Sequence, residues 1–204
     1  MPRRNGTERL EARRARLERH AGETDPAVVL NAAARFLELR SRSVDEVRRH
    51  LAAAAFPEPL VEVAIDRLLD LGVLDDRVFA QSWVESRDRA RPRGEVALRR
   101  ELHFKGIDRE TVEAVLAERS EAVTGDPGEG SDAAPGIAAG GADELAAERL
   151  IGKNRSALLR VADPRARRQR SYALLARNGF DPEVCREVSG RFADASAGSD
   201  EGDR

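Results

Sequence analysis

The chain has 204 residues, of which 35% are charged and only 4% are aromatic. Its apolar residues are mostly alanine, leucine and valine, a mixture that favours amphipathic helices and argues against a β-sandwich. The formal net charge of −2 excludes a general attraction to nucleic acid or membranes, so any such binding needs an uneven distribution of charge.

The expected location follows from cysteine content and from the absence of apolar runs. Cys185 is the only cysteine, which excludes an internal disulfide and fits a reducing compartment. The first residues are charged as far as Arg19 and have no apolar stretch behind them, unlike a signal peptide. No apolar run is long enough to span a bilayer. We therefore expect a cytoplasmic protein.

Residues 1–24 form a charged N-terminal tail with almost nothing to bury. A charged helix and a disordered basic tail both fit this composition, and we expect disorder. Residues 26–40 carry apolar side chains at helical spacing and predict the first buried helix. Ser43 and Glu46 form a capping-box pattern that opens the next helix. The third helix has Pro59 in its first turn and ends at Gly72.

The stretch LGVLDDRVFAQSWVESRDRARPRG, residues 71–94, begins a second set of helices. Asp75 or Asp76 is expected to cap its first helix. The buried stripe of this helix is predicted to contain Phe79, Ala80, Trp83 and Val84.

A pattern of helix, tight turn and helix occurs three times in the chain. The stretches are LAAAAFPEPLVEVAI from Leu51, LHFKGIDRETVEAVL from Leu102 and LARNGFDPEVCREVS from Leu175. In each, a small residue allows the turn and the apolar residue after it docks against both helices. The aligned sets are Ala55, Gly106 and Gly179; Phe56, Ile107 and Phe180; Val61, Val112 and Cys185; and Ala64, Val115 and Val188.

The repeated pattern predicts an all-α fold of three tandem three-helix repeats that form an elongated, curved stack. The repeats are expected at residues 25–73, 74–120 and 143–192. An acidic, glycine- and alanine-rich linker, residues 121–142, separates the second repeat from the third, and an acidic disordered tail is expected at residues 193–204.

Two motifs of the second repeat resemble the core signature of the RecX family. They are LDDRVFAQSW and RPRGEVALRRELHFKGID. LELRSRSVDEVRRHL, residues 37–51, looks like the motif of the family's first repeat, and LLARNGFDPEV, residues 174–184, like that of its third. The resemblance implies a regulator, not an enzyme, that binds within the filament of the RecA recombinase on DNA. It also implies that the regulator dampens RecA activities in recombination, DNA repair and the SOS response.

Basic residues are concentrated in two runs, which supply the candidate contacts with DNA or a protein partner. Nine bases between residues 149 and 177 face only one acid, Asp163, whereas acids interleave with the bases of residues 87–105. Arginine at this density can bind phosphates or carboxylates, or it can simply solvate helix faces. We favour binding for residues 149–177, where acids are almost absent, and weigh the two explanations evenly for residues 87–105. The candidates are Arg87, Arg91, Arg93, Arg99, Arg100, Lys105, Lys153, Arg155, Arg165, Arg167, Arg168 and Arg170.

The last helix of each repeat is acidic instead of basic. Glu58, Glu62, Asp66 and Asp70 form one stripe, and pairs follow at Glu110 and Glu113 and at Glu183 and Glu187. Phosphates would repel such helices, which argues against three DNA-reading helix-turn-helix motifs. The stripes are either docking surfaces for a basic patch or solvated faces. Trp83 and Phe79 could stack on bases, but their place in the apolar stripe favours core packing.

No pattern for catalysis, a cofactor or a metal stands out. Cys185 aligns with Val61 and Val112, which indicates a buried apolar role. The three histidines lack metal-ligand spacing, and no phosphate-binding glycine loop is present. We expect a monomeric regulator of the RecA filament that touches the filament's single-stranded DNA and binds bare DNA at most weakly. A helical repeat protein that binds DNA phosphates directly, without a recombinase, is the alternative.

Overall fold

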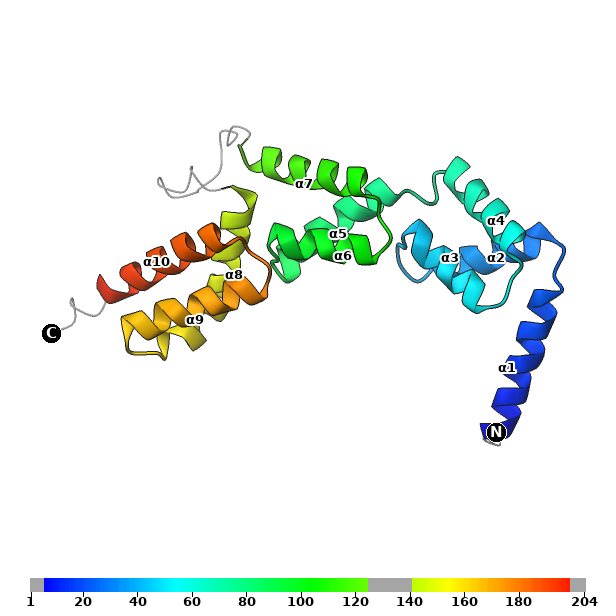
Figure 1. Cartoon of the computed structure of the whole chain (residues 1–204), viewed down its shortest axis with the longest axis horizontal. Helices are drawn as coiled ribbons and strands as arrows, with labels where there is room; N and C mark the ends of the chain where they lie inside the picture. The colour runs from blue at the N-terminus through cyan, green and yellow to red at the C-terminus, as the bar shows by residue number, and fades with distance from the viewer. Residues whose placement is uncertain (1–5, 125–140, 199–204) are drawn as a thin grey trace. The chain divides into compact units, whose positions relative to one another are not determined.

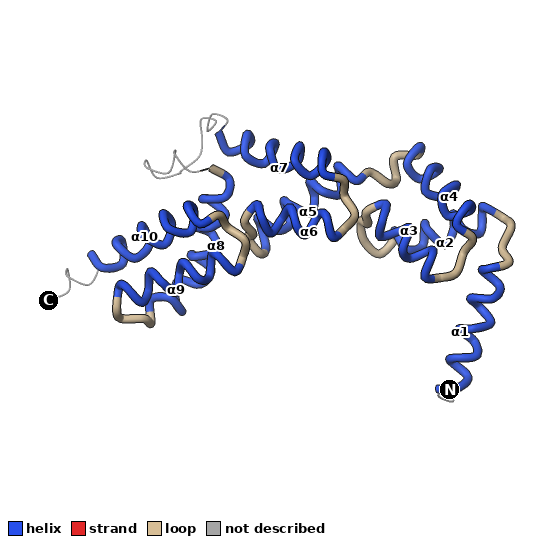
Figure 2. The backbone as a smooth tube through the Cα atoms, viewed as in Figure 1, coloured by secondary structure: helices blue, strands red, loops and turns tan. Residues whose placement is uncertain are grey.

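The computed structural model describes residues 6–124 and 141–198, and these residues form ten α-helices and no strand (Figures 1 and 2). The all-α prediction is therefore confirmed. The helices are α1 Gly6–Ala21, α2 Pro26–Leu37, α3 Val44–Ala53, α4 Glu58–Asp70, α5 Asp76–Ala90, α6 Glu95–Phe104, α7 Arg109–Thr124, α8 Ala142–Leu159, α9 Pro164–Arg177 and α10 Pro182–Gly198.

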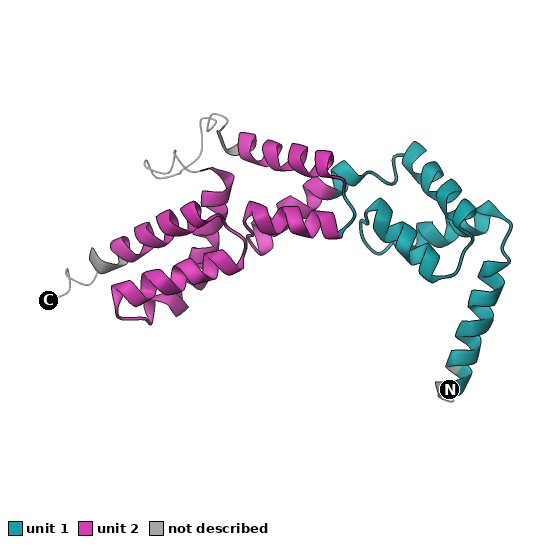
Figure 3. Ribbon diagram, in the orientation of Figure 1, with its two compact units in different colours: residues 1–79, 105–107 teal, residues 80–104, 108–204 magenta. Residues whose placement is uncertain are grey.

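The chain divides into two compact units (Figure 3). Unit 1 comprises residues 1–79 and 105–107, and unit 2 comprises residues 80–104 and 108–204. Of the helices in the described ranges, none combines the length and the apolar composition needed to cross a membrane.

Unit 1 is built around a small apolar core shared by α2, α3 and α4. Val29, Val47, Leu51 and Ile65 are at most 1% exposed. The predicted capping box of α3 is confirmed: the Ser43 hydroxyl accepts from the Glu46 amide, and the Glu46 carboxylate accepts from the Ser43 amide. Two amide donors at this helix end are thereby satisfied.

The charged N-terminal segment is helical as α1, which differs from the disorder we expected. The contact that orders its end is aromatic. The His20 ring stacks on Phe56 with 4.1 Å between the ring centroids, and His20 Nδ1 lies 2.9 Å from the carbonyl oxygen of Ala54. The expectation of disorder rested on the scarcity of apolar residues in this segment, and it could not anticipate a contact made by a single histidine.

Unit 2 contains a second core, formed by α8, α9 and α10. Leu175, Cys185 and Val188 are nearly inaccessible to solvent, with Phe180 packed among them. Its helices extend further than the sequence indicated: α7 runs to Thr124 and α10 to Gly198, into the stretches expected to be linker and tail. The rest of both stretches, residues 125–140 and 199–204, lies outside the described residues.

The three predicted turns all use a left-handed backbone conformation, as the alignment requires. Gly106 and Gly179 have φ of 81° and 79°, and Ala55 has φ of 67°. The following residues, Phe56, Ile107 and Phe180, are buried. The prediction of small residues at the turns and apolar anchors after them is therefore confirmed.

Ala55 is the only non-glycine residue of the described chain with positive φ, and this identifies a stabilising substitution. A Cβ in this conformation costs about 1 kcal/mol, which glycine avoids. We expect Ala55→Gly to raise the unfolding free energy of unit 1 by up to about 1 kcal/mol, less the greater freedom of glycine in the unfolded chain. Urea unfolding followed by NMR would show a higher midpoint, and a lower midpoint would contradict the prediction.

The start of α3 is joined to residues 105–107 of unit 1. The Ser43 hydroxyl donates to the carbonyl oxygen of Lys105 at 2.6 Å, and the Val44 amide donates to the Asp76 carboxylate at 2.9 Å. The chain passes Gly106 so closely that a Cβ there would lie 2.3 Å from the Asp45 Cβ.

The start of α6 is joined in the same way to the turn after α9 in unit 2. The Gly94 amide donates to the carbonyl oxygen of Asn178 at 3.1 Å, and the Glu95 amide donates to the Asp143 carboxylate. In the repeat alignment Gly94 is equivalent to Ser43, and Asn178 to Lys105. One kind of joint thus occurs twice, once in each unit.

This joint explains the pair of aspartates at residues 75 and 76. Asp75 caps α5, because its carboxylate accepts from the amides of Arg77 and Val78. Asp76 instead accepts from the Val44 amide at the start of α3. The two carboxylates therefore have different roles: Asp75 caps its own helix, and Asp76 binds the first amide of α3.

Glu46 connects the capping box of α3 to Lys105. Its carboxylate accepts from Lys105 Nζ at 2.7 Å and from Arg40 Nη2 at 3.0 Å. Burial alone would raise the pKa of Glu46, but the hydrogen bonds from Lys105 and Arg40 outweigh it and lower the pKa from 4.5 to about 2.

The low pKa of Glu46 makes the stability of unit 1 depend on pH. The folded state binds this proton less tightly than the unfolded chain, so the stabilisation is complete above pH 4.5 and is lost as the pH falls toward 2. We expect Glu46→Gln to lose about 2 kcal/mol of unfolding free energy at neutral pH and most of this pH dependence. Urea unfolding at several pH values, followed by NMR of α3, measures both; an unchanged pH dependence in the variant would refute the assignment.

Candidate functional site

Six exposed arginines from α8, α9 and the loop between them have no carboxylate within ion-pair distance among the described residues. We call them the α8–α9 arginine surface. Its members are Arg155, Arg160, Arg165, Arg168, Arg170 and Arg177. Asp163, the one acid nearby in sequence, is occupied as the N-cap of α9, where it accepts from the amides of Arg165 and Ala166. The positive charge of this surface is therefore uncompensated within the described chain.

Arg167 does not belong to this surface, although the sequence placed it among the candidate contacts. It is only 4% exposed, and it donates from Nε to the carbonyl oxygen of Val161 and from Nη2 to that of Ala162. Its side chain therefore holds the loop between α8 and α9 from inside. A run of basic residues in the sequence does not show which of them points inward. The prediction that Arg167 contacts a partner is therefore wrong.

The basic run at residues 87–105 is mostly paired with acids. Arg87 Nε donates to Glu101 at 2.7 Å and lies over the Trp83 ring, whose Nε1 donates to the same carboxylate. Arg99 donates to both Glu95 and Glu113. These hydrogen bonds raise the pKa of Arg99 against the opposing effect of burial. Arg87 and Arg99 therefore have structural partners, and Trp83 is half-buried instead of presenting an open stacking face.

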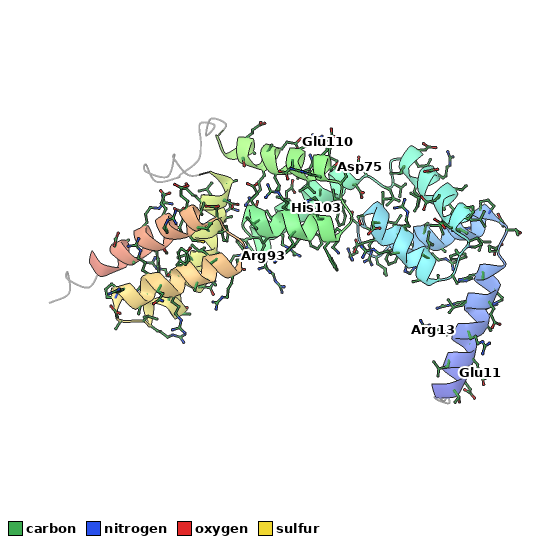
Figure 4. The ribbon with its side chains drawn as sticks, in the orientation of Figure 1. Glu11, Arg13, Asp75, Arg93, His103 and Glu110 are labelled. Atoms are coloured by element: carbon green, nitrogen blue, oxygen red, sulfur yellow. The ribbon has the colours of Figure 1, made fainter. Side chains whose placement is uncertain are left out.

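Three other basic candidates are bound to groups of the chain itself. Arg93 lies at the start of α6 beside the end of α9 (Figure 4), donates to the Asn178 side chain at 2.6 Å and approaches Glu101 at 3.5 Å. Lys105 is bound to Glu46, and Lys153 donates to the carbonyl oxygens of Arg89 and Ala90 at the end of α5. Of the run at residues 87–105, only the candidates Arg91 and Arg100 are exposed without a carboxylate partner in the described chain.

The acidic faces of α4, α7 and α10 are partly neutralised. Glu62 is paired with Arg48 at 2.8 Å and Glu113 with Arg99 at 2.8 Å. In both cases the hydrogen bond from arginine lowers the pKa of the glutamate. The exposed acids of α4 are Glu58, Asp66 and Asp70, so part of the predicted stripe stays open to solvent.

Cys185 and His50 are both packed against other side chains of the fold. Cys185 is fully buried in the α8–α10 core, and burial raises the pKa of its thiol, which makes it a poor nucleophile. The His50 ring stacks on Phe36 at 3.8 Å, and burial lowers the pKa of His50. No group of three or more His, Cys, Asp or Glu side chains in residues 6–124 and 141–198 is placed to hold a metal ion.

The sequence missed three residues that matter in the structure. Arg160 and Arg177 belong to the α8–α9 arginine surface but were not among the candidate contacts, although both lie in the basic run that was noticed. The Arg119 side chain is 7% exposed and joins Asp88 to Asp143 inside unit 2. No local signal marks it, since its partners lie 31 and 24 residues away.

Sequence comparison assigns two consecutive segments of the chain to one family. The model of the first three-helix domain of RecX matches residues 30–68, and that of the second matches residues 75–116. Regulatory protein RecX of Mycobacterium avium (strain 104) is 32% identical over 154 residues, which cover 76% of this chain and 78% of the relative. Regulatory protein RecX of Mycobacterium tuberculosis (strain ATCC 25618 / H37Rv) is 34% identical over 155 residues, with 76% and 79% covered.

Two solved structures share the fold. RecX from Lactobacillus salivarius matches with a TM-score of 0.64 at 18% identity, covering 82% of this chain and 96% of that one. A crystal structure of a regulatory protein RecX matches with a TM-score of 0.62 at 19% identity, covering 81% and 71%. The sequence relationships and the shared all-α fold together show that this chain belongs to the RecX family, whose members are regulatory proteins and not enzymes.

Proposed function

We propose that this protein binds the filament that the RecA recombinase forms on single-stranded DNA and inhibits its recombinase, ATPase and co-protease activities. The setting would be homologous recombination, DNA repair and the SOS response. Membership of the RecX family supports the choice of partner.

The observation that carries this proposal is the uncompensated α8–α9 arginine surface. Buried or paired arginines hold a fold together, whereas six exposed arginines without carboxylate partners in the described chain add repulsion and no ion pair. Such a surface is stabilised when it meets phosphates or carboxylates of a partner. A RecA–DNA filament offers both kinds of anion.

The first test is inhibition of RecA. DNA-dependent ATP hydrolysis by a bacterial RecA on single-stranded DNA is measured while this protein is titrated in, and binding to the same bare DNA is measured by fluorescence anisotropy. We expect hydrolysis to fall at protein concentrations well below those that coat bare DNA. Unchanged hydrolysis at saturating protein would contradict the proposal.

Charge reversal on the α8–α9 arginine surface should weaken the inhibition. We expect the variant R165E/R168E/R170E to need at least about tenfold more protein for half-inhibition, because three favourable contacts with anions become repulsive. The three side chains are exposed, so helicity measured by circular dichroism should be unchanged. Arg167 is left intact because reversing a buried charge would disturb the loop that it holds.

The matched control is R67E/R109E/R186E, which changes the net charge equally at exposed arginines outside the surface. It should inhibit RecA nearly as well as the unchanged protein. Equal losses in both variants would mean that net charge alone acts, and would remove the α8–α9 surface from the mechanism.

Direct binding to DNA phosphates, without a recombinase, is the second candidate function. The same arginine surface favours it, since its side chains suit any polyanion. Tight, strongly salt-dependent binding to bare duplex DNA together with undisturbed RecA hydrolysis would establish this function in place of the first.

A further inference from the structure

A hollow of about 310 Å³ lies between the end of α8 and the outer face of α9. Three members of the α8–α9 arginine surface line it: Arg160, Arg170 and Arg177. Arg170 and Arg177 are seven residues apart, two helical turns along one face of α9, and Arg160 faces them as the C-cap of α8. Asn154 adds an amide, while Leu158 and Leu174 supply an apolar lining.

No negative group in the described chain balances these three guanidinium groups. None of them has a carboxylate within ion-pair distance among the residues described, and Asp163 is engaged with the first amides of α9. Cations gathered in one hollow repel each other unless an anion joins them. The hollow is therefore suited to an anionic ligand.

The helix end beside the hollow does not oppose such a ligand as strongly as a bare helix C-terminus would. The last carbonyl groups of a helix carry partial negative charge. Here the Leu158 carbonyl accepts from the amides of Arg160 and Val161. Buried Arg167 donates to the next carbonyls in the loop, those of Val161 and Ala162. The charge of Arg167 lies directly against these oxygens, which reduces their repulsion of an anion.

We infer that this hollow is a binding site for the phosphodiester backbone of single-stranded nucleic acid. Guanidinium groups bind phosphate oxygens in pairs, and apolar side chains set among them match a strand in which sugars alternate with phosphates. The lining contains no aromatic side chain on which a base could stack, so binding should not depend on base sequence. The inference deepens the proposed function and rests on it for the strand in question, the DNA of the RecA filament.

The test neutralises the three arginines of the hollow and compares this variant with one that loses the same charge elsewhere. The variant R160Q/R170Q/R177Q is compared with R67Q/R109Q/R186Q, which removes three charges at exposed arginines outside the α8–α9 arginine surface. The probe is a short fluorescein-labelled oligothymidine, titrated with full-length protein at several salt concentrations. Circular dichroism and the fluorescence of Trp83, the only tryptophan, verify the fold of each variant.

We expect the hollow variant to bind the oligothymidine at least about tenfold more weakly, and the slope of log affinity against log salt to shrink by about 2, since three phosphate contacts on a single strand are lost. The control variant should retain most of the affinity and most of the salt dependence. A labelled oligomer of mixed sequence should give the same result, because no base is read. Equal losses in both variants, or binding by the hollow variant like that of the unchanged protein, would overturn the site.

The RecA assay separates failure of this inference from failure of the proposed function. If the hollow variant binds DNA normally but no longer inhibits RecA hydrolysis, the hollow takes carboxylates of the protein partner and the phosphate site is wrong. If the unchanged protein leaves RecA hydrolysis untouched while the hollow variant loses DNA binding, the proposed function fails and the phosphate site stands.

Discussion

Replacing Gly94 by alanine is expected to destabilise unit 2 by about 3 kcal/mol or more. A Cβ at this position would lie 2.2 Å from the carbonyl oxygen of Gly179 and 2.4 Å from the Cα of Phe180. These are backbone atoms, so no side-chain rotation relieves the overlap. Relief requires the joint between α6 and the turn after α9 to open, with loss of the hydrogen bond from the Gly94 amide to Asn178.

Trp83 fluorescence during urea unfolding measures this loss in unit 2, and hydrogen exchange locates it. We expect the Gly94 variant to show faster exchange of the amides at the turn after α9. Gly152→Ala is the matched control, because Gly152 lies inside α8 with nothing within 4 Å of an added Cβ. That substitution should raise the stability by about 0.5–1 kcal/mol. A Gly94 variant as stable as the parent would show that the close approach does not exist in solution.

The helices were predictable because their signals are local. The capping box at Ser43, the left-handed turns at Gly106 and Gly179 and the apolar anchors after them all appear within a few residues of chain. Their periodicity and their turn chemistry point to the same structure. The helix bounds were less predictable, since α7 and α10 continue into stretches whose composition suggested a linker and a tail.

The role of each arginine was not predictable, because it depends on partners distant in sequence. Arg93 meets Asn178 across 85 residues, and Lys105 meets Glu46 across 59. Counting acids and bases within a window treats these side chains as exposed charge. Where the window itself lacked acids, as around α9, the sequence correctly indicated uncompensated arginines, but it could not separate buried Arg167 from its exposed neighbours.

The repeated joint gives a physical reason for motifs that a regulatory protein must keep regardless of its partner. The glycine of the KG dipeptide and the glycine after Arg93 both sit where another chain segment approaches. Asp76 in the first turn of α5 and Asp143 in the first turn of α8 each accept a hydrogen bond from the first amide of an earlier helix. These residues hold helices in register, and the exposed arginines of α8 and α9 take no part in that role.

Arg119→Met is expected to cost unit 2 about 3–5 kcal/mol, because it removes one cation from between two carboxylates. Arg119 binds Asp88 through two hydrogen bonds of 2.8 and 2.9 Å and Asp143 through one of 2.6 Å. Burial opposes the charge of Arg119, but these hydrogen bonds outweigh it and raise its pKa. In the methionine variant Asp88 and Asp143 stay, about four-fifths buried, with no cation between them.

Trp83 fluorescence during urea unfolding gives the size of the loss, and its pH dependence identifies the cause. If uncompensated carboxylates are responsible, the deficit should shrink as the pH falls from 7 toward 4, because protonation removes the stranded charges. Arg119→Lys should recover only part of the stability, since a point charge does not reproduce the paired hydrogen bonds to Asp88 while also reaching Asp143. A loss of unfolding free energy that does not depend on pH would mean that Arg119 contributes through packing. Its ion pairs with Asp88 and Asp143 would then add nothing to the stability of unit 2.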